Sequence, residues 1–181
     1  MGDVRERWVA DLDIYRSGSG NACGNATLAL RVLVMPRLQA VTLFRLSEWL
    51  HVSGRVSAAM IVKGLNQALT GADITPSARI AGGLQLFHPQ GVVIGPDVVI
   101  GKRARITSGV VIGKGPRRHP ERANVRAVIG DDVSIGSHAV IAGDVFFGDH
   151  VDIGAHVVVT RDIPTDGKVR PPHAIIDAGL G

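Results

Sequence analysis

The sequence predicts a mainly β protein: a parallel β-helix that follows an N-terminal α-helical region. One observation is a change in periodicity, because apolar residues follow a helical spacing up to about residue 70 and a spacing of six residues from Ile74 onward. The other is that a glycine follows the aliphatic residue in most of these six-residue units. A period of six fits neither an α-helix nor a sheet of hairpins, and it is typical of a parallel β-helix.

Residues 1–70 form the predicted helical region. The segment RERWVADLDIYR is short and amphipathic, and SGSGNACGN after it has the composition of a loop. In LALRVLVMPRLQAVTLFRLSEWLHVSG the apolar residues keep a roughly helical period, with a break at Pro36 and an end near Gly54. A further helix is predicted from Arg55 to Leu69.

The β-helix is predicted over residues 71–166, followed by a C-terminal tail at 167–181. Thirteen large apolar positions are in register: Ile74, Ile80, Leu86, Ile94, Ile100, Ile106, Ile112, Ile129, Ile135, Ile141, Phe147, Ile153 and Val159. Three units make one triangular coil, so four to five coils are expected, with these side chains in a stacked core.

The count of six is interrupted twice. The step from Leu86 to Ile94 is eight residues, and the step from Ile112 to Ile129 is seventeen, which assigns an extended loop to 114–127. Core and turn positions explain the regular units completely. Function is therefore expected at the two interruptions.

The composition favours a protein of the cytoplasm. The single cysteine, Cys23, excludes an internal disulfide framework and gives no metal-ligand spacing. No apolar run reaches the roughly 18 residues of a membrane span, and the first residues lack an apolar signal segment, so no membrane is expected. The net charge of +4 suits an anionic partner, but the scarcity of aromatic residues and the lack of a recognisable module argue against nucleic acid.

The first interruption is FHPQG, which contains His88. An isolated histidine is most often a surface turn residue, but this one lies at an irregularity beside a proline-glycine loop. Asp73 lies fifteen positions upstream, close to one coil, and could reach the imidazole. A carboxylate bonded to one ring nitrogen fixes the tautomer and leaves the other nitrogen basic.

The second interruption, GKGPRRHPERANVRAV, concentrates basic side chains around His119. A basic loop can be merely solvated, but one that projects from a regular prism is better explained as an arm that covers a cleft. Its guanidinium groups would bind carboxylate or phosphate through forked hydrogen bonds. The basic residues are Lys114, Arg117, Arg118, Arg122 and Arg126.

Four segments are similar to motifs of one family. GADITPSARI, HPQGVVIG, RRHP and IGAHVVVTRDIP resemble the G-x-D-I-x-P, H-x-x-G-x-V-x-G, R-H-P and I-G-A-x-S-V-V-x-x-D-V-P motifs of the serine O-acetyltransferases, which are hexapeptide-repeat acyltransferases. The resemblance runs from about Asp11 to Val169. It implies a left-handed parallel β-helix with an N-terminal α-helical region.

The resemblance also implies the chemistry. His88 matches the general base and Asp73 its partner, and the base takes the proton from an acceptor hydroxyl that attacks the thioester of acetyl-CoA directly. Arg118 and His119 match residues that hold the carboxylate of the acceptor. Acetyl-CoA enters as the acyl-donor substrate, and no metal is expected.

CoA in this family lies in a groove between adjacent prisms. The matching positions here are Gly113, Ser137 and Ala155, with Lys114 as a candidate for the phosphates. Because such a groove needs two subunits, a homotrimer is implied, and pairing of trimers through the N-terminal helices is a further option.

Two departures from the family concern the acceptor. Phe87 stands where the family has an acidic residue before the catalytic histidine, and SGSGNACG replaces an Asp-Pro that helps to bind the ammonium group of serine. RRHP, which recognises an acid, is kept. The predicted acceptor is therefore L-serine or a related small carboxylic acid, with Phe87 at the acceptor site and with another hydroxyl or amine of secondary metabolism as the alternative.

Two other classes compete with the acetyltransferase. Hexapeptide prisms also occur as scaffolds, which would make this a non-catalytic trimer. Carbonic anhydrases on the same prism bind zinc through three histidines between subunits, but the histidines here do not have that family's spacing. The residues considered are His88, His119, His138, His150 and His156.

Overall fold

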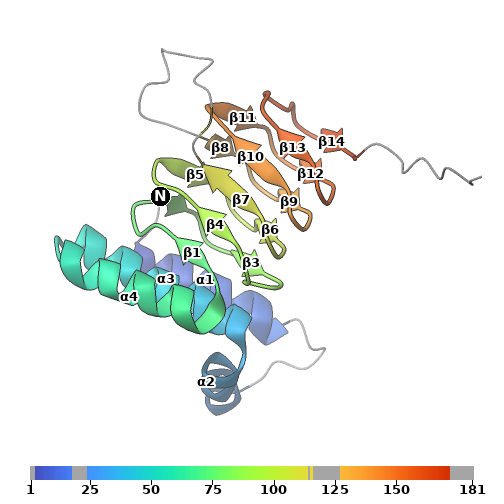
Figure 1. Cartoon of the computed structure of the whole chain (residues 1–181). Helices are drawn as coiled ribbons and strands as arrows, with labels where there is room; N and C mark the ends of the chain where they lie inside the picture. The colour runs from blue at the N-terminus through green and yellow to red at the C-terminus, as the bar shows by residue number, and fades with distance from the viewer. Residues whose placement is uncertain (1–2, 18–23, 114, 116–126, 172–181) are drawn as a thin grey trace, which may run out of the picture.

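A layer of helices covers one end of a β-prism in the computed structural model, which describes residues 3–17, 24–113, 115 and 127–171 (Figure 1). The helices within these ranges are α1 (Val4–Ser17), α2 (Asn25–Val34), α3 (Pro36–Val52) and α4 (Val56–Thr70). By length and apolar composition, none of them alone could cross a membrane, although Ala26–Val34 and Pro36–Val52, which meet at a 95° bend, pass the same test as a pair.

The predicted helix boundaries are confirmed. Pro36 begins α3, where a missing backbone N–H costs nothing because the first turn has no acceptor for it. Gly54 and Gly71 follow the ends of α3 and α4 with φ of +77°, the left-handed conformation that glycine adopts without strain. The chain then turns directly into the first strand.

The strands are two or three residues long and form three parallel sheets, A, B and C (Figure 1). Sheet A contains β1 (Asp73–Ile74), β4 (Val93–Ile94), β7 (Val111–Gly113), β10 (Val140–Ala142) and β13 (Val158–Val159). Sheet B contains β2 (Arg79–Ile80), β5 (Val98–Ile100), β8 (Ala127–Ile129) and β11 (Val145–Phe147). Sheet C contains β3 (Gln85–Leu86), β6 (Arg105–Ile106), β9 (Ser134–Ile135), β12 (Asp152–Ile153) and β14 (Lys168–Val169).

The core is the one predicted from the period of six. All thirteen registered side chains are buried, and within each sheet they stack on one another from coil to coil. The first coil is longer than most of the others: Asp73 pairs with Val93, twenty residues on, whereas Val93 pairs with Val111, eighteen residues on. The two extra residues lie between β3 and β4 and widen the corner between sheets C and A.

The C-terminal boundary differs from the prediction. β14 pairs with β12, so the β-helix continues beyond residue 166 into the segment that the sequence assigned to the tail. The sequence period did not predict this last strand, because Val169 lies ten residues after Val159 instead of six.

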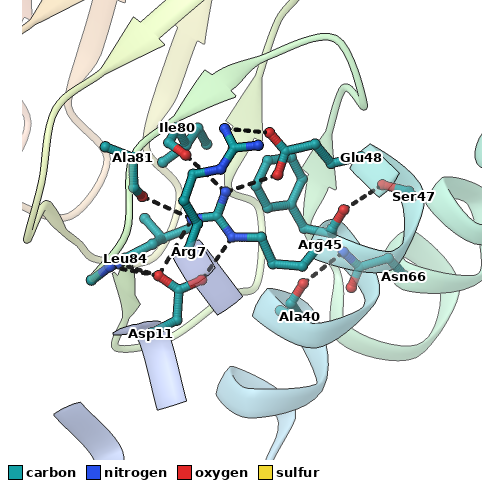
Figure 2. A network of polar contacts seen from close by, with 12 residues as sticks. Arg7, Asp11, Ala40, Arg45, Ser47, Glu48, Asn66, Ile80, Ala81 and Leu84 are labelled. Atoms are coloured by element: carbon teal, nitrogen blue, oxygen red, sulfur yellow. Dashed lines mark hydrogen bonds and ion pairs between the residues drawn. The ribbon is translucent and has the colours of Figure 1, made fainter. Parts of the chain in front are cut away.

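A buried ion network joins the helical layer to the prism (Figure 2). The Arg45 side chain of α3 is 1% exposed, and its Nε donates to the Asp11 carboxylate of α1 at 2.7 Å. A second nitrogen donates to Glu48 at 2.9 Å, and Arg7 pairs with the other oxygen of Glu48 at 3.0 Å. Burial alone would lower the pKa of Arg45, but the two carboxylates outweigh it and raise that pKa, so the guanidinium stays charged.

The same network contacts the backbone of the first coil. The guanidinium of Arg45 donates to the carbonyls of Ile80 and Ala81, each at 2.8 Å. The Asp11 carboxylate accepts the backbone N–H groups of Gly83 and Leu84, each at 2.7 Å. Sheet B, sheet C and helices α1 and α3 are thereby held in one arrangement, with the start of α3 close to the widened corner.

Candidate active site

His88 lies in the widened corner between sheets C and A. β3 ends at Leu86 and β4 begins at Val93, and the side chains of Phe87 and His88 between them are exposed. Pro89 is buried, and Gly91 takes the left-handed conformation at φ +72°, which lets the chain turn into sheet A. The irregularity therefore places an exposed imidazole at the corner, beside strands whose large aliphatic residues point into the core.

His88 and the start of α3 line one cavity of about 270 Å³. Met35, Pro36 and Arg37 form one side, and Phe87, His88, Pro89 and Gln90 form the other. Among the described residues His88 makes no hydrogen bond or ion pair, so its ring nitrogens are available to a ligand.

Asp73 is occupied by a different partner. Its carboxylate forms an ion pair with the ammonium group of Lys63 on α4, and it stacks beneath Val93 in sheet A rather than beneath His88. No hydrogen bond or ion pair joins Asp73 to His88 in the described part of the chain. The pairing of these two residues stays a prediction.

Two of the predicted CoA residues stand in one column with His88. His88, Ser137 and Ala155 each lie two residues after a stacked core position of sheet C, at Leu86, Ile135 and Ile153. The backbone N–H of His156 donates to the Ser137 carbonyl at 2.8 Å, which ties the two upper corners together. The structure thus brings these candidates to one edge of the prism.

Gly113 lies on the other side of sheet A. It ends β7, at the edge between sheets A and B, and a Cβ placed on it would meet nothing within 4 Å. A single chain therefore does not unite Gly113 with the His88 column. Lys114, Arg118 and His119 lie outside the described residues.

A second cavity, of about 290 Å³, was not predicted from the sequence. It shares Met35, Arg37 and Phe87 with the His88 cavity and is also lined by Tyr15, Arg31 and Gln85. The guanidinium of Arg37 lies 5.4 Å from the centroid of the Tyr15 ring, and Arg31 donates to the Tyr15 carbonyl at 3.3 Å. No sequence motif joins these residues, because they come from three helices and from the prism and meet only when the helices pack against it.

Tyr15 fixes the floor of this second cavity. Its hydroxyl accepts the backbone N–H of Leu86 at 3.2 Å, so α1 is tied to the strand that precedes Phe87. Burial raises the pKa of Tyr15 to about 12, against smaller lowering effects from the Leu86 hydrogen bond and from Arg37. The phenol is therefore neutral at physiological pH.

Metal ligation finds no support in the described ranges. No three His, Cys, Asp or Glu side chains there come close enough to hold an ion. His138 and His156 stack with ring centroids 5.1 Å apart, and both occupy turn positions with φ of +58°. They are exposed corner residues of successive coils.

Comparison with known proteins gives one consistent result. No model of a protein family matches the sequence. A serine acetyltransferase from Helicobacter pylori is 36% identical over 130 residues, which cover 63% of this chain and 75% of that protein. One from Synechococcus elongatus is 34% identical over 139 residues, which cover 75% of this chain and 54% of that protein. The chain thus spans about half the length of the Synechococcus relative.

Solved structures agree over nearly the whole chain. Serine acetyltransferase isoform 3 from Entamoeba histolytica, in complex with cysteine, has a TM-score of 0.81 at 27% identity and covers 98% of this chain and 62% of that one. The serine acetyltransferase of Neisseria gonorrhoeae, in complex with serine, has a TM-score of 0.77 at 31% identity and covers 93% and 67%. The fold is therefore the predicted one, a left-handed parallel β-helix with an N-terminal α-helical region.

Proposed function

Because the chain belongs to the serine acetyltransferase family, we propose that it moves an acetyl group from acetyl-CoA to the hydroxyl of a small carboxylic acid acceptor. One observation carries this proposal: His88 projects from the widened corner into a cavity at the start of α3, without a partner among the described residues. L-Serine is the first acceptor to test, since the Neisseria relative was solved with serine bound.

The proposed reaction is a direct transfer. A ring nitrogen of His88 accepts the proton of the acceptor hydroxyl. At the same time the hydroxyl oxygen attacks the thioester carbonyl carbon of acetyl-CoA. The tetrahedral intermediate then collapses, the carbon–sulfur bond breaks, and the imidazolium returns the proton to the departing thiolate. A base positioned in this way accelerates a reaction by about 10²–10⁴-fold, and holding both substrates together adds to it.

Asp73 is proposed to orient His88. In the described structure its carboxylate is engaged by Lys63, so this role requires the carboxylate to exchange one partner for the other when the substrates bind. A carboxylate that accepts one N–H of the imidazole would leave the other nitrogen free to take the proton of the acceptor.

We propose a homotrimer with sheet A facing the threefold axis. His88 lies at one edge of sheet A; Gly113, which precedes the predicted loop, and Ala127, the last residue of that loop, lie at the other. Around such an axis the second edge of one copy meets the first edge of the next, and both sets of predicted residues would contribute to one site. The outward column of sheet A supports this, because it contains Val93, Val111, Val140 and Val158.

The remaining assignments are proposals of the same kind. Arg118 and His119 would hold the carboxylate of the acceptor, and Gly113, Ser137 and Ala155, with Lys114, would bind CoA. The single cysteine supports a reducing compartment such as the cytoplasm.

The test is release of CoA thiol from acetyl-CoA in the presence of L-serine and other small hydroxy acids. We expect His88→Ala to lower kcat by about 10²–10⁴-fold, and His150→Ala, which removes another exposed corner histidine, to leave kcat within about twofold. Undiminished turnover by His88→Ala would contradict the proposal. Turnover by no acceptor, from a protein that still forms trimers, would favour the scaffold, and zinc in the purified protein would favour the carbonic anhydrase.

A further inference from the structure

We infer that the acceptor carries a second anionic group beside its carboxylate, and that Arg37, assisted by Arg31, binds this group. The inference rests on the proposed function and names the class of acceptor that the site takes: a small hydroxy acid with an extra carboxylate or phosphate and no ammonium group. Arg37 is the residue that determines this specificity.

The position of Arg37 carries the inference. Arg37 and His88 line the same cavity of about 270 Å³. A cavity of this size suits a small metabolite and is too small for a peptide chain. An acceptor whose hydroxyl lies at His88 therefore has Arg37 in the same surface cavity. The neighbouring cavity adds Arg31 behind Arg37, so two guanidinium groups lie on the side of the site formed by α2 and α3.

The charge at this position is uncompensated. Neither Arg31 nor Arg37 forms an ion pair among the described residues, and Asp11 and Asp13 of α1 have partners of their own. Asp11 is buried against Arg45, and Asp13 lies 3.7 Å from Arg16. A cationic group of a ligand would therefore meet two like charges and no counter-ion, whereas an anion would pair with both.

Arg37 is also held in place before a ligand arrives. Its guanidinium lies over the Tyr15 ring at 5.4 Å, and one of its nitrogens lies 3.8 Å from the sulfur of Met35. Neither contact neutralises its charge or occupies all of its donors, since guanidinium carries five N–H groups. A positioned, half-buried guanidinium with free donors is suited to a forked bond with carboxylate or phosphate.

Phe87, across the cavity from Arg37, also favours an acceptor without an ammonium group. It is 41% exposed and lines both cavities, at the position where the resemblance to the family implies an acid. An aromatic ring in place of a carboxylate gives an ammonium group a cation–π contact instead of an ion pair, which is the weaker interaction. Phe87 and Arg37 together therefore disfavour serine itself and favour an acceptor with a negative charge in place of its ammonium.

One series of acceptors tests this directly. L-Serine, glycerate, 2-(hydroxymethyl)succinate and 2-phosphoglycerate share a hydroxymethyl and a carboxylate group, and they differ in an ammonium, hydroxyl, carboxymethyl or phosphate substituent. We expect kcat/KM to be highest for one of the two acceptors with the extra anion, about 10- to 100-fold above glycerate, and lowest for serine. Whichever of 2-(hydroxymethyl)succinate and 2-phosphoglycerate has the higher kcat/KM shows whether the second anionic group is a carboxylate or a phosphate.

Variants assign the effect to Arg37. Arg37→Gln should raise KM for the preferred anionic acceptor about 10- to 100-fold and leave kcat/KM for glycerate within about threefold. Arg37→Lys should restore part of the loss. Arg55→Gln, at the N-cap of α4, is the control and should change neither value.

Binding of the same anions to the free protein, measured by calorimetry, separates the two proposals. If Arg37→Gln binds these anions more weakly than the wild type, the anion site is supported, whether or not any acceptor is acetylated. If no acceptor is acetylated, the proposed function alone is contradicted. If serine is the best acceptor and Arg37→Gln leaves the ranking unchanged, the inference is overturned and the proposed function stands. Anion affinity that is equal in wild type and Arg37→Gln also overturns the inference.

Discussion

Single side chains at the junction of helices and prism decide what the site can bind. Tyr15 shows this most clearly, since its ring supports Arg37, its carbonyl accepts from Arg31, and its hydroxyl accepts from the backbone of Leu86. Burial of the ring, rather than these contacts, keeps the phenol neutral, since it raises the pKa of Tyr15 to about 12. The residue therefore links the stability of the fold to the geometry of the proposed anion site.

The ionisation of Tyr15 is a prediction for alkaline pH. It is the single tyrosine of the chain, so its absorbance near 295 nm reports one group, and the midpoint should be about 12 in the native protein. In urea the midpoint should be about 10, the ordinary value. Because folding raises this pKa, its contribution to stability is complete below pH 10 and is lost as the pH rises toward 12, by about 2–3 kcal/mol.

The matched control is Tyr15→Phe. Its free energy of unfolding should fall less between pH 10 and 12 than that of the wild type, because the titrating group is gone. A native midpoint near 10, or equal slopes for the two proteins, would show that the phenol is not buried as described.

At the scale of elements, the corners of the prism set how closely its coils stack. A Cβ added to Gly136 would lie 2.5 Å from the backbone nitrogen of Ala155, on the next coil. Backbone atoms at that distance cannot yield locally, so the coils would have to separate. By contrast, Gly64 lies in the exposed face of α4 with nothing within 4 Å of an added Cβ.

The same substitution should therefore have opposite effects at the two glycines. Gly136→Ala should lower the free energy of unfolding by about 1–3 kcal/mol through overpacking. Gly64→Ala should raise it by about 0.5–1 kcal/mol, since alanine is the better helix former. Urea denaturation of both variants measures these changes. If Gly136→Ala leaves the free energy of unfolding unchanged, the corner is packed less tightly than described.

The whole molecule presents a surface that one chain leaves incomplete. The outward column of sheet A changes from Asp73 at the helical end to four valines above it, and the Val158 side chain is 67% exposed. The equivalent column of sheet C is polar throughout: Gln85, Arg105, Ser134, Asp152 and Lys168. Sheet A is therefore the better candidate for the contact between copies.

Light scattering after gel filtration tests the trimer. The wild-type mass should be three times the chain mass of 19.0 kDa, and Val158→Asp should give a folded monomer, because burying an unpaired charge in an interface is costly. Ser134→Asp, on the outward face of sheet C, should remain a trimer. A monomeric wild type, or a trimeric Val158→Asp, would rule out the arrangement around sheet A.

Much of the fold could be predicted because it repeats. The period of six places Ile100 and Ile106 in the core without knowledge of any distant contact, since each coil reproduces the environment of the one below. Helix ends at Pro36 and Gly54 follow from local backbone chemistry in the same way. The last strand escaped prediction because Val169 departs from the count that identified the others.

The sequence by itself therefore determined the prism, its core and the place where the count fails at His88, because these depend on local spacing. The tertiary structure decided which residues surround that histidine. Arg37 and Tyr15 are fifty or more positions away from it; packing of the helical layer on the end of the prism brings Arg37 to the same cavity and places Tyr15 against Arg37. Asp73 was predicted beside His88 from the length of one coil; in the described structure it pairs with Val93 in sheet A and forms an ion pair with Lys63, and its pairing with His88 stays a prediction. Contacts between layers depend on packing and on exact coil length, and a one-dimensional period does not contain that information.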